Sequence, residues 1–374
     1  MHKSFKLQGE SFQNPLELIS FSETISEELY WFLQEWFSDA ETLIVQTSGS
    51  TGKPKLISIK KELMQNSAKA TGTFFDLGIG TKALCCLSVN YIAGKMMVIR
   101  ALTLGWELDV IEPVGNPLEN AFEEYDFCAM VPMQVQASLW DLNLVKKLLI
   151  GGGVVSQTLQ EDLQSLSTEC FASYGMTETV SHIAVKKLNH FNSTPLDDEN
   201  TKDSKKEVFE RSREVNLSDV EGNGLRAESR SFYQVLPNIT ISQDNRACLV
   251  IDAPLLSEEK VITNDVVKMI SDNEFEWLGR YDHVINSGGV KLHPEQIEKE
   301  LSKIIVERFF VTGIPDEILG EKLILVVEGE DRVCDFSSLA LSKYQIPKQT
   351  YFIDQFVETE TKKIQRKATL KLLF

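Results

Sequence analysis

The chain has 374 residues, of which 43% are hydrophobic and 25% are charged, and this length and composition predict two or three globular domains with a substantial core. A formal net charge of −17 argues against a basic face that binds nucleic acid, and no stretch is apolar over enough residues to cross a bilayer. The six cysteines form no CxxC pair and no Cys/His ligand spacing, which indicates reduced thiols in a cytoplasmic protein.

The N-terminal part leads into a loop that is rich in Gly, Ser and Thr. Apolar residues at near-helical spacing predict a helix over 24–37, with Thr24 and Glu27 as its capping box. The segment TSGSTGKPK at 47–55 offers backbone N–H groups and hydroxyls, the donors that hold a polyphosphate, although it lacks the Walker A pattern GxxxxGK[ST]. Short strands are predicted on both sides of it, at 41–46 and 56–60.

Apolar runs typical of buried strands then alternate with helical segments. Strands are predicted at 83–89, 108–112, 127–131 and 146–152, and helices or turns at 61–77, 93–104, 135–139 and 158–166. Because parallel strands need crossover connections, this alternation predicts an α/β fold with a largely parallel sheet.

The rest of the chain divides into three parts. Residues 193–231 are almost all polar, which predicts an inserted, mobile surface segment and favours a solvated loop over a partner-binding lid. Residues 232–254 predict antiparallel strands around a QDNR turn. A compact α+β unit follows, with helices predicted at 293–304 and 337–344 and strands at 308–316 and 322–330. We therefore expect a large domain over 1–281 and a small one over 282–374.

Five short segments of distinctive composition follow one another along the chain. They are TSGSTGKPK at 47–55, YGMTET at 174–179, TND at 263–265, GRYDHVINSGGVKLHPEQIE at 279–298 and KKIQRKA at 362–368. Together they resemble the signature motifs of the adenylate-forming superfamily of acyl-CoA synthetases, luciferases and nonribosomal adenylation domains. The resemblance implies a large domain of α/β layers with a small β-barrel-like part, and a small mobile α+β domain after it. It also implies that ATP and Mg²⁺ activate a carboxylic acid, and that coenzyme A receives the acyl group.

The resemblance assigns most nucleotide contacts to two of these motifs and to a glycine run. The ATP-binding residues it implies there are Thr47, Ser48, Gly49, Ser50, Thr51, Gly52, Lys53, Gly151, Gly152, Gly153, Tyr174, Gly175 and Met176. The ring of Tyr174 would stack on adenine, although its residue type fits a core tyrosine equally well. Thr177 would donate its hydroxyl to the α-phosphate, and Glu178 would bind Mg²⁺ through its hard carboxylate oxygens.

The later motifs supply the remaining roles. Asp265 would accept hydrogen bonds from the ribose hydroxyls and Arg280 would add a cationic contact, although Asn264 stands where the superfamily usually has Gly. Lys363 would stabilise the negative charge that builds at the α-phosphorus, although Lys362 also replaces a usual Gly. Asp282 would be the hinge of the small domain. The segment Ser287, Gly288 and Gly289 would lie beside the pantetheine arm of coenzyme A.

Two segments narrow the choice of the carboxylic acid substrate. Residues 88–102 and 148–156 look like the substrate-pocket segments of compact o-succinylbenzoate–CoA ligases of menaquinone biosynthesis, and only 46 residues precede the phosphate loop. Tyr91 would form the pocket wall, and a lysine would pair with a substrate carboxylate. The candidates are Lys95 and either Lys146 or Lys147, each of which fits an ordinary surface lysine equally well.

Three alternatives stay open at this point. The protein could act on another aryl or small acyl acid, load a carrier-protein thiol instead of coenzyme A, or bind ligands without catalysis. The motif residues argue against the last, and the pattern leaves a homodimer open.

Overall fold

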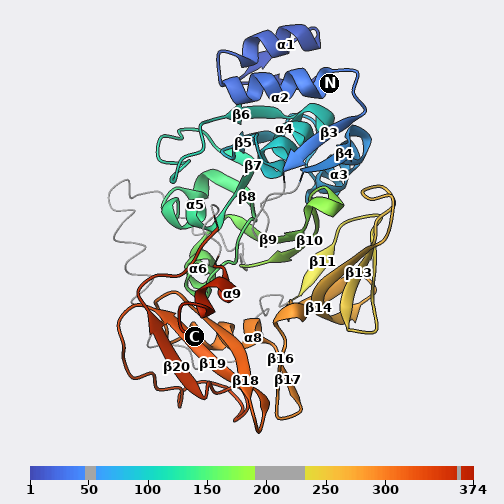
Figure 1. The fold of residues 1–374 in the computed structure, drawn as a ribbon. Coiled ribbons are helices and arrows are strands. Elements are labelled where there is room, and N and C mark those ends of the chain that lie inside the picture. Colours follow the sequence, from blue (N-terminus) through green and yellow to red (C-terminus); the bar gives the residue numbers. More distant parts are fainter. Residues whose placement is uncertain (47–55, 190–231, 360–363) are drawn as a thin grey trace, which may run out of the picture. The chain divides into compact units, whose positions relative to one another are not determined.

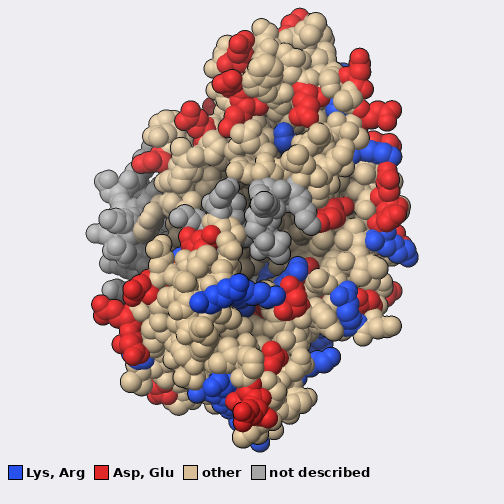
Figure 2. Space-filling model, viewed as in Figure 1, with Lys and Arg blue, Asp and Glu red and all other residues tan. Residues whose placement is uncertain are grey.

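The computed structural model describes residues 1–46, 56–189, 232–359 and 364–374 (Figure 1). The chain divides into two compact units, each with its own core. Unit 1 comprises Met1–Val45, Ser58–Asn238 and Leu255–Glu258, and unit 2 comprises Gln46–Ile57, Ile239–Pro254 and Glu259–Phe374. No helix in the described ranges is long and apolar enough to span a membrane. Figure 2 shows acidic side chains scattered over one face with basic ones between them.

Unit 1 is built on a sheet whose central strands are parallel. The order β6-β5-β7-β8-β9 is parallel throughout, β1 adds to it in parallel beside β6, and β10 and β11 continue it antiparallel beyond β9. The bounds are β1 Lys6–Leu7, β5 Lys82–Cys85, β6 Glu107–Val110, β7 Tyr125–Met130, β8 Val145–Ile150, β9 Glu169–Gly175, β10 His182–Lys187 and β11 Tyr233–Val235. The near-continuous burial of β5 and β7 explains why their sequences read as apolar runs.

Helices cover this sheet. Helices α3 (Lys61–Phe75) and α4 (Ile92–Leu104) pack against each other (Figure 1). The stretch Gly94–Leu102 of α4 is buried throughout, so α4 is an interior helix. Gly94 lies close to the backbone of Ser88, where a Cβ would collide with the carbonyl oxygen. The short helices α5 (Pro132–Ala137) and α6 (Gln157–Asp162) follow β7 and β8.

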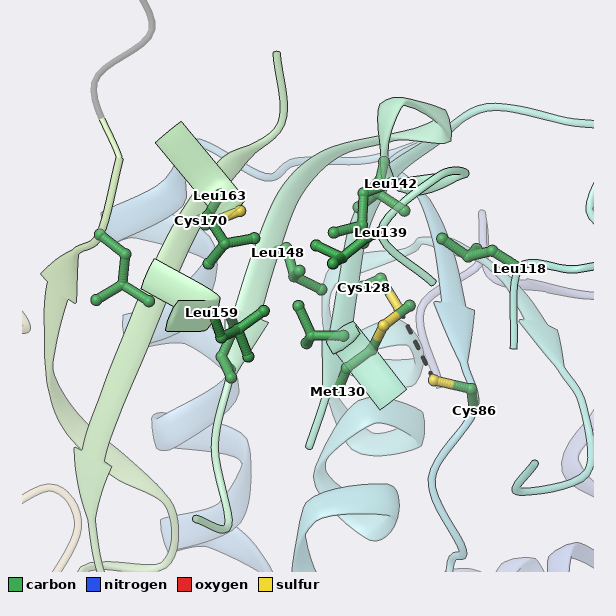
Figure 3. Close-up of a cluster of buried hydrophobic side chains, with 14 of the residues drawn as sticks. Cys86, Leu118, Cys128, Met130, Leu139, Leu142, Leu148, Leu159, Leu163 and Cys170 are labelled. Carbon is green, nitrogen blue, oxygen red and sulfur yellow. Dashed lines mark hydrogen bonds between the residues drawn. The ribbon is translucent and has the colours of Figure 1, made fainter. Parts of the chain in front are cut away.

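A cluster of buried apolar side chains joins β7, β8 and β9 to these short helices (Figure 3). Leu139, Leu148 and Leu159 lie within it, and the sulfur atoms of Cys86 and Cys128 are 3.9 Å apart. All six cysteines are free thiols, and five of them are buried.

The N-terminal helices differ in detail from the prediction. Helix α1 (Pro15–Ser22) was not predicted, and α2 spans Glu27–Phe37. The capping box predicted at Thr24 is wrong: Ser26 caps α2, because its hydroxyl accepts a hydrogen bond from the backbone N–H of Leu29 (3.1 Å). The Thr24 hydroxyl instead donates to the carbonyl oxygen of Phe21 (2.7 Å). The two strands predicted on either side of the phosphate loop are present as β3 (Thr42–Gln46) and β4 (Leu56–Lys60). They pair with each other.

Unit 2 contains two groups of strands. The first is antiparallel and ordered β12-β13-β14-β15, with bounds Thr240–Gln243, Cys248–Asp252, Val261–Ser271 and Glu274–Arg280. The second is ordered β17-β16-β19-β18, with β20 beside β19, and its strands are β16 Ile285–Ser287, β17 Val290–Leu292, β18 Phe309–Asp316, β19 Gly320–Glu328 and β20 Gln349–Ile353. Helix α8 (Pro294–Leu301) packs on β18 and β15, and α9 spans Arg366–Leu370.

The helix predicted at 337–344 is wrong, because these residues form turns. Leu339 and Leu341 pack on the core of unit 2, and a spacing of two residues does not place side chains on one face of a helix. The side chain of Gln345 also accepts a hydrogen bond from the backbone N–H of Ser342 (3.0 Å), which satisfies a donor outside any helix. The predicted division of the chain at 281/282 stays a prediction.

Candidate active site

Two predicted nucleotide segments meet at the carboxyl edge of the parallel sheet. Gly151–Gly153 follow β8, and Tyr174 and Gly175 end the neighbouring strand β9. A Cβ on Gly151 would lie 2.6 Å from the hydroxyl oxygen of Ser173, so a larger residue would require that side chain to move. Open α/β sheets bind ligands beyond the carboxyl ends of their strands, and these residues lie there.

The turn that carries Thr177 and Glu178 is held rigidly. The hydroxyl of Thr179 is buried, accepts a hydrogen bond from the backbone N–H of Met176 (3.3 Å) and lies 3.0 Å from the carbonyl oxygen of Ser181. A Cβ on Gly175 would collide with Ser181, which explains the glycine. Thr177 is therefore partly exposed and Glu178 exposed on a fixed turn, an arrangement in which both can reach a ligand.

Tyr174 lies against a second aromatic ring. Its centroid is 5.7 Å from that of Tyr233 on β11, and the two rings are tilted by 57°. Burial raises the pKa of Tyr233 to about 12, so this phenol stays neutral. Tyr233 thus fixes one edge of the ring that is predicted to stack on adenine.

The predicted substrate lysines already have partners. Lys95 is 8% exposed, its Nζ lies 4.7 Å from the ring centroid of Phe32, and burial lowers its pKa. Lys146 pairs with Asp126 (2.8 Å), and Lys147 donates to the carbonyl oxygen of Phe75 (2.7 Å). Lys146 and Lys147 lie at the amino end of β8, away from the carboxyl edge. Tyr91 is 53% exposed at the start of α4.

A different cation, Arg100, is buried in unit 1. It lies on α4 and is 2% exposed. Its guanidinium donates to the hydroxyls of Thr71 (3.2 Å) and Ser181 (2.9 Å), and Nη2 lies 3.4 Å from Nδ1 of His182. Among the described residues no Asp or Glu pairs with it. Burial lowers its pKa to about 10, which reflects the cost of an unpaired buried charge.

The tautomer of His182 follows from this contact. Burial, and then the positive charge of Arg100, hold the pKa of His182 well below its usual value, so its ring is neutral. Because a guanidinium only donates, Nδ1 must accept and the proton must be on Nε2. Nε2 is buried and has no hydrogen-bond partner within the described residues. The cluster of Arg100, Ser181 and His182 therefore presents a cation and an unused N–H donor.

This cluster was not predicted from the sequence, although Arg100 lies within the predicted substrate-pocket segment 88–102. The signal was a single charged residue, Arg100, inside the apolar run MMVIRAL. A charge in such a run is rarely buried unless it is paired or has a function.

Unit 2 brings Asp265, Arg280 and Asp282 together. Asp265 on β14 is opposite Arg280 on β15, and Nε of Arg280 donates to Asp282 (3.0 Å). The Asp265 side chain is 8% exposed and accepts a hydrogen bond from the indole N–H of Trp277 (3.1 Å). The side chain of Asn264, which replaces the usual glycine, accepts from Arg246 (2.8 Å). Trp277 and Arg246 were not predicted.

The SGG segment forms a tight hairpin. Ser287 ends β16, and Gly288 and Gly289 form the turn to β17 with φ angles of +58° and +80°. A two-residue hairpin with positive φ at both positions favours glycine, so the turn itself explains both residues. Their role beside coenzyme A stays a prediction.

Three predicted features lie outside the described residues: the phosphate loop from Thr47 to Lys53, the polar insertion at 193–231, and Lys363. The segment after Lys363 is anchored, because Arg366 pairs with Glu298 on α8 (2.9 Å) and donates to the carbonyl oxygen of Val311 (3.2 Å). No group of three or more metal-binding side chains occurs in the described ranges. An exposed single carboxylate such as Glu178 nevertheless fits Mg²⁺, which is bound largely by substrate phosphates and water.

Comparisons with known proteins identify the family of the chain. The family of AMP-binding enzymes matches residues 22–225. A 2-succinylbenzoate–CoA ligase from Geobacillus sp. (strain WCH70) is 25% identical over 389 residues, which cover 98% of this chain and 76% of the relative.

Solved structures show the same fold. An acyl-CoA synthetase (AMP-forming)/AMP-acid ligase II-like protein from Dyadobacter fermentans is 35% identical, with a TM-score of 0.58 and coverage of 95% of this chain and 98% of its own. The o-succinylbenzoate CoA synthetase from Bacillus subtilis, in complex with an acyl-adenylate intermediate, shares the fold at 19% identity, with a TM-score of 0.67 over 87% of this chain and 68% of its own. The predicted adenylate-forming fold is thus confirmed. Since the family match spans more than half of its length, the chain belongs to the AMP-binding enzymes and is an ATP-using, AMP-forming acid–thiol ligase.

Proposed function

We propose that this ligase converts o-succinylbenzoate, ATP and coenzyme A to o-succinylbenzoyl-CoA, AMP and pyrophosphate, a step of menaquinone biosynthesis. Several relatives that carry the name 2-succinylbenzoate–CoA ligase support this substrate. The observation in the structure that carries the proposal is the buried cluster around Arg100.

That cluster suits a dicarboxylic acid. When one carboxylate of o-succinylbenzoate reacts, the other keeps its charge and needs a partner in a site with little water. Arg100 has no acidic partner among the described residues, and Nε2 of His182 has an unused N–H. A buried charge is costly unless it is paired, so both groups fit the second carboxylate. The cluster is contiguous with the turn 177–179, which would place this acid near the α-phosphate.

The first half-reaction would join the acid to AMP. The substrate carboxylate attacks the α-phosphorus of ATP, and pyrophosphate leaves. Thr177 would donate to the α-phosphate, Tyr174 would lie against adenine, and Lys363 would stabilise the charge of the transition state. The loop 47–53 would hold the outer phosphates, and Mg²⁺ on Glu178 would offset their charge when bound.

In the second half-reaction the thiol of coenzyme A attacks the adenylate carbonyl and AMP leaves. We propose that residues 282–374 rotate about Asp282 between the two steps, and that the pantetheine passes Ser287–Gly289. Such a rotation would have to break two hydrogen bonds, because Gln296 on α8 donates to the carbonyl oxygens of Trp277 and Leu278 (3.2 Å each).

The test is direct. The purified protein is incubated with o-succinylbenzoate, ATP, Mg²⁺ and coenzyme A, and mass spectrometry follows the thioester. Pyrophosphate release is measured in parallel with a panel of aryl and small acyl acids, with and without coenzyme A. Thioester formed fastest from another acid would overturn the substrate. Acyl transfer to a phosphopantetheinylated carrier protein, with none to coenzyme A, would overturn the thiol.

A further inference from the structure

We propose that Trp277 and Arg246 are positioning residues that set how the enzyme recognises the ribose of its nucleotide. They act on Asp265, and the inference therefore rests on the ribose-binding role of Asp265 in the proposed function. Neither residue belongs to the motifs that predicted the site.

Trp277 holds the side chain of Asp265. It lies on β15, three residues before Arg280, and its Nε1–H donates to Oδ1 of Asp265 at 3.1 Å. A hydrogen bond to a carboxylate in a site that is 8% exposed is stronger than one at the surface. The bond fixes the rotation of the carboxylate about its side-chain torsions.

Trp277 is itself held from its backbone side. The amide Nε2 of Gln296 lies 3.2 Å from the carbonyl oxygens of both Trp277 and Leu278. The backbone that carries the indole is thus bound to α8, and the N–H points at Asp265 from an anchored residue. This is the kind of supporting contact that keeps a ligand-binding side chain within a few tenths of an ångström of its working position.

Arg246 holds the backbone on which Asp265 lies. Its Nη1 donates to the side chain of Asn264 (2.8 Å), its Nη2 donates to the carbonyl oxygen of Thr263 (3.0 Å), and its Nε donates to Asp244 (2.8 Å). The guanidinium also lies 5.2 Å from the ring centroid of Tyr281. A planar fork with several fixed donors can grip two consecutive residues at once, which a lysine ammonium does not do.

Thr263 passes this constraint to Asp265. Its hydroxyl accepts from the backbone N–H of Asp265 (3.0 Å) and donates to the carbonyl oxygen of Leu249 (2.8 Å). Side chain and backbone of Asp265 are therefore fixed from two directions, by Trp277 and by Arg246. A vicinal diol offers two donors at a set spacing, so a carboxylate that tilts loses one of the two ribose hydrogen bonds.

The experiment compares ATP with 2′-deoxy-ATP in the full-length enzyme. Trp277→Phe keeps an aromatic ring and removes the N–H. We expect the KM for ATP to rise about tenfold with kcat within about twofold, and the preference for ATP over 2′-deoxy-ATP in kcat/KM to fall by a similar factor. Arg246→Lys keeps the charge, loses the fork and should act in the same direction.

Two matched variants control for general effects. Trp31→Phe removes another indole-to-carboxylate hydrogen bond, that of Trp31 to Glu27 (3.3 Å), from a residue that is 60% exposed. Arg332→Lys alters an exposed ion pair with Glu307 in unit 2. Both controls should keep the wild-type preference for ATP, and thermal unfolding checks that all four variants fold.

The outcomes distinguish a failure of the positioning role of Trp277 and Arg246 from a failure of the ribose-binding role of Asp265. If Asp265→Ala loses the ribose preference while Trp277→Phe and Arg246→Lys keep it, the positioning role is wrong and the ribose role of Asp265 stands. If Asp265→Ala also keeps the preference, the assignment of Asp265 itself fails. If Trp277→Phe does not fold, Arg246→Lys decides the question alone.

Discussion

Replacing Arg100 by methionine tests whether this buried cation serves the substrate or the fold. Methionine fills similar space on α4 without a charge. The hydroxyls that Arg100 contacts keep other partners, since Thr71 donates to the carbonyl oxygen of Ser67 (3.0 Å) and Ser181 lies 3.2 Å from Nδ1 of His182. Apolar replacement of buried charges is often neutral or stabilising, so we expect the free energy of unfolding to stay unchanged or to rise by about 1 kcal/mol.

Activity should change in the opposite direction. If the second carboxylate of o-succinylbenzoate pairs with Arg100, removing the cation leaves that carboxylate buried without a partner. Truncating one side of such a pair costs about 2–5 kcal/mol, which corresponds to a loss of roughly 30- to 5,000-fold in kcat/KM. Arg100→Lys keeps the charge but not the fork, and should fall between the wild type and Arg100→Met.

The assay combines urea denaturation with pyrophosphate release. A monocarboxylic analogue that lacks the second carboxylate serves as control, because wild type and Arg100→Met should use it about equally. Undiminished turnover of o-succinylbenzoate by Arg100→Met would refute the assignment. So would a loss of stability above about 2 kcal/mol, since it would indicate that the guanidinium supports the fold.

The other predictions concern three further groups. Lys363→Ala should lower the rate of adenylate formation, measured by pyrophosphate exchange, by at least about 10²-fold. Thioester formation from supplied acyl-adenylate should stay nearly intact, and an equal loss of both steps would contradict the role of Lys363. The pKa of His182 is lower in the folded than in the unfolded state, so the unfolded state binds more protons below about pH 6.5 and the free energy of unfolding falls as the pH drops. His182→Asn should make the free energy of unfolding depend less on pH in denaturation between pH 7.5 and 5.5. An unchanged pH dependence would argue against a buried neutral His182. Burial raises the pKa of Glu298, which pairs with Arg366. Arg366→Ala should therefore lower the free energy of unfolding in urea by about 2 kcal/mol, most strongly at high pH, where the unpaired carboxylate must ionise. An unchanged free energy of unfolding would show that the pair is dispensable.

Strands with strong local signals could be predicted from the sequence. The buried strands β7 and β8 read as apolar runs of the right length, and the helix or turn predicted at 93–104 corresponds to α4. Helix α1 also had a readable signal that was missed: Asn14 caps it by accepting from the backbone N–H groups of Leu16 and Glu17, with Pro15 at the first position. The false helix at 337–344 had helix-forming residue types but no periodic apolar face.

The motifs predicted the nucleotide residues, but they did not contain Arg100, Trp277 or Arg246. Arg100 contacts Thr71 and Ser181, which are 29 and 81 residues away in the chain, so no local pattern encodes the contact. Trp277 and Asp265 are closer, 12 residues apart on paired strands. A bulge between Val266 and Val267 shifts the register there, and a shift of one residue decides which side chains face each other.

Buried polar groups in this core differ in how completely the fold satisfies their hydrogen bonds. Asn189 is fully buried, and its side chain accepts from the backbone N–H of Cys170 (3.0 Å) and donates to the carbonyl oxygens of Leu163 (3.0 Å) and Thr168 (2.8 Å). Every bond it needs is made within the fold, so no ligand is required to explain it. Arg100 and His182 are buried to a similar degree, yet a cation without an acid and an N–H without an acceptor remain among the described residues. An anionic ligand beside these two groups would supply both missing partners. We therefore propose this cluster, rather than the lysines that already have partners, as the place where the second carboxylate of the acid binds.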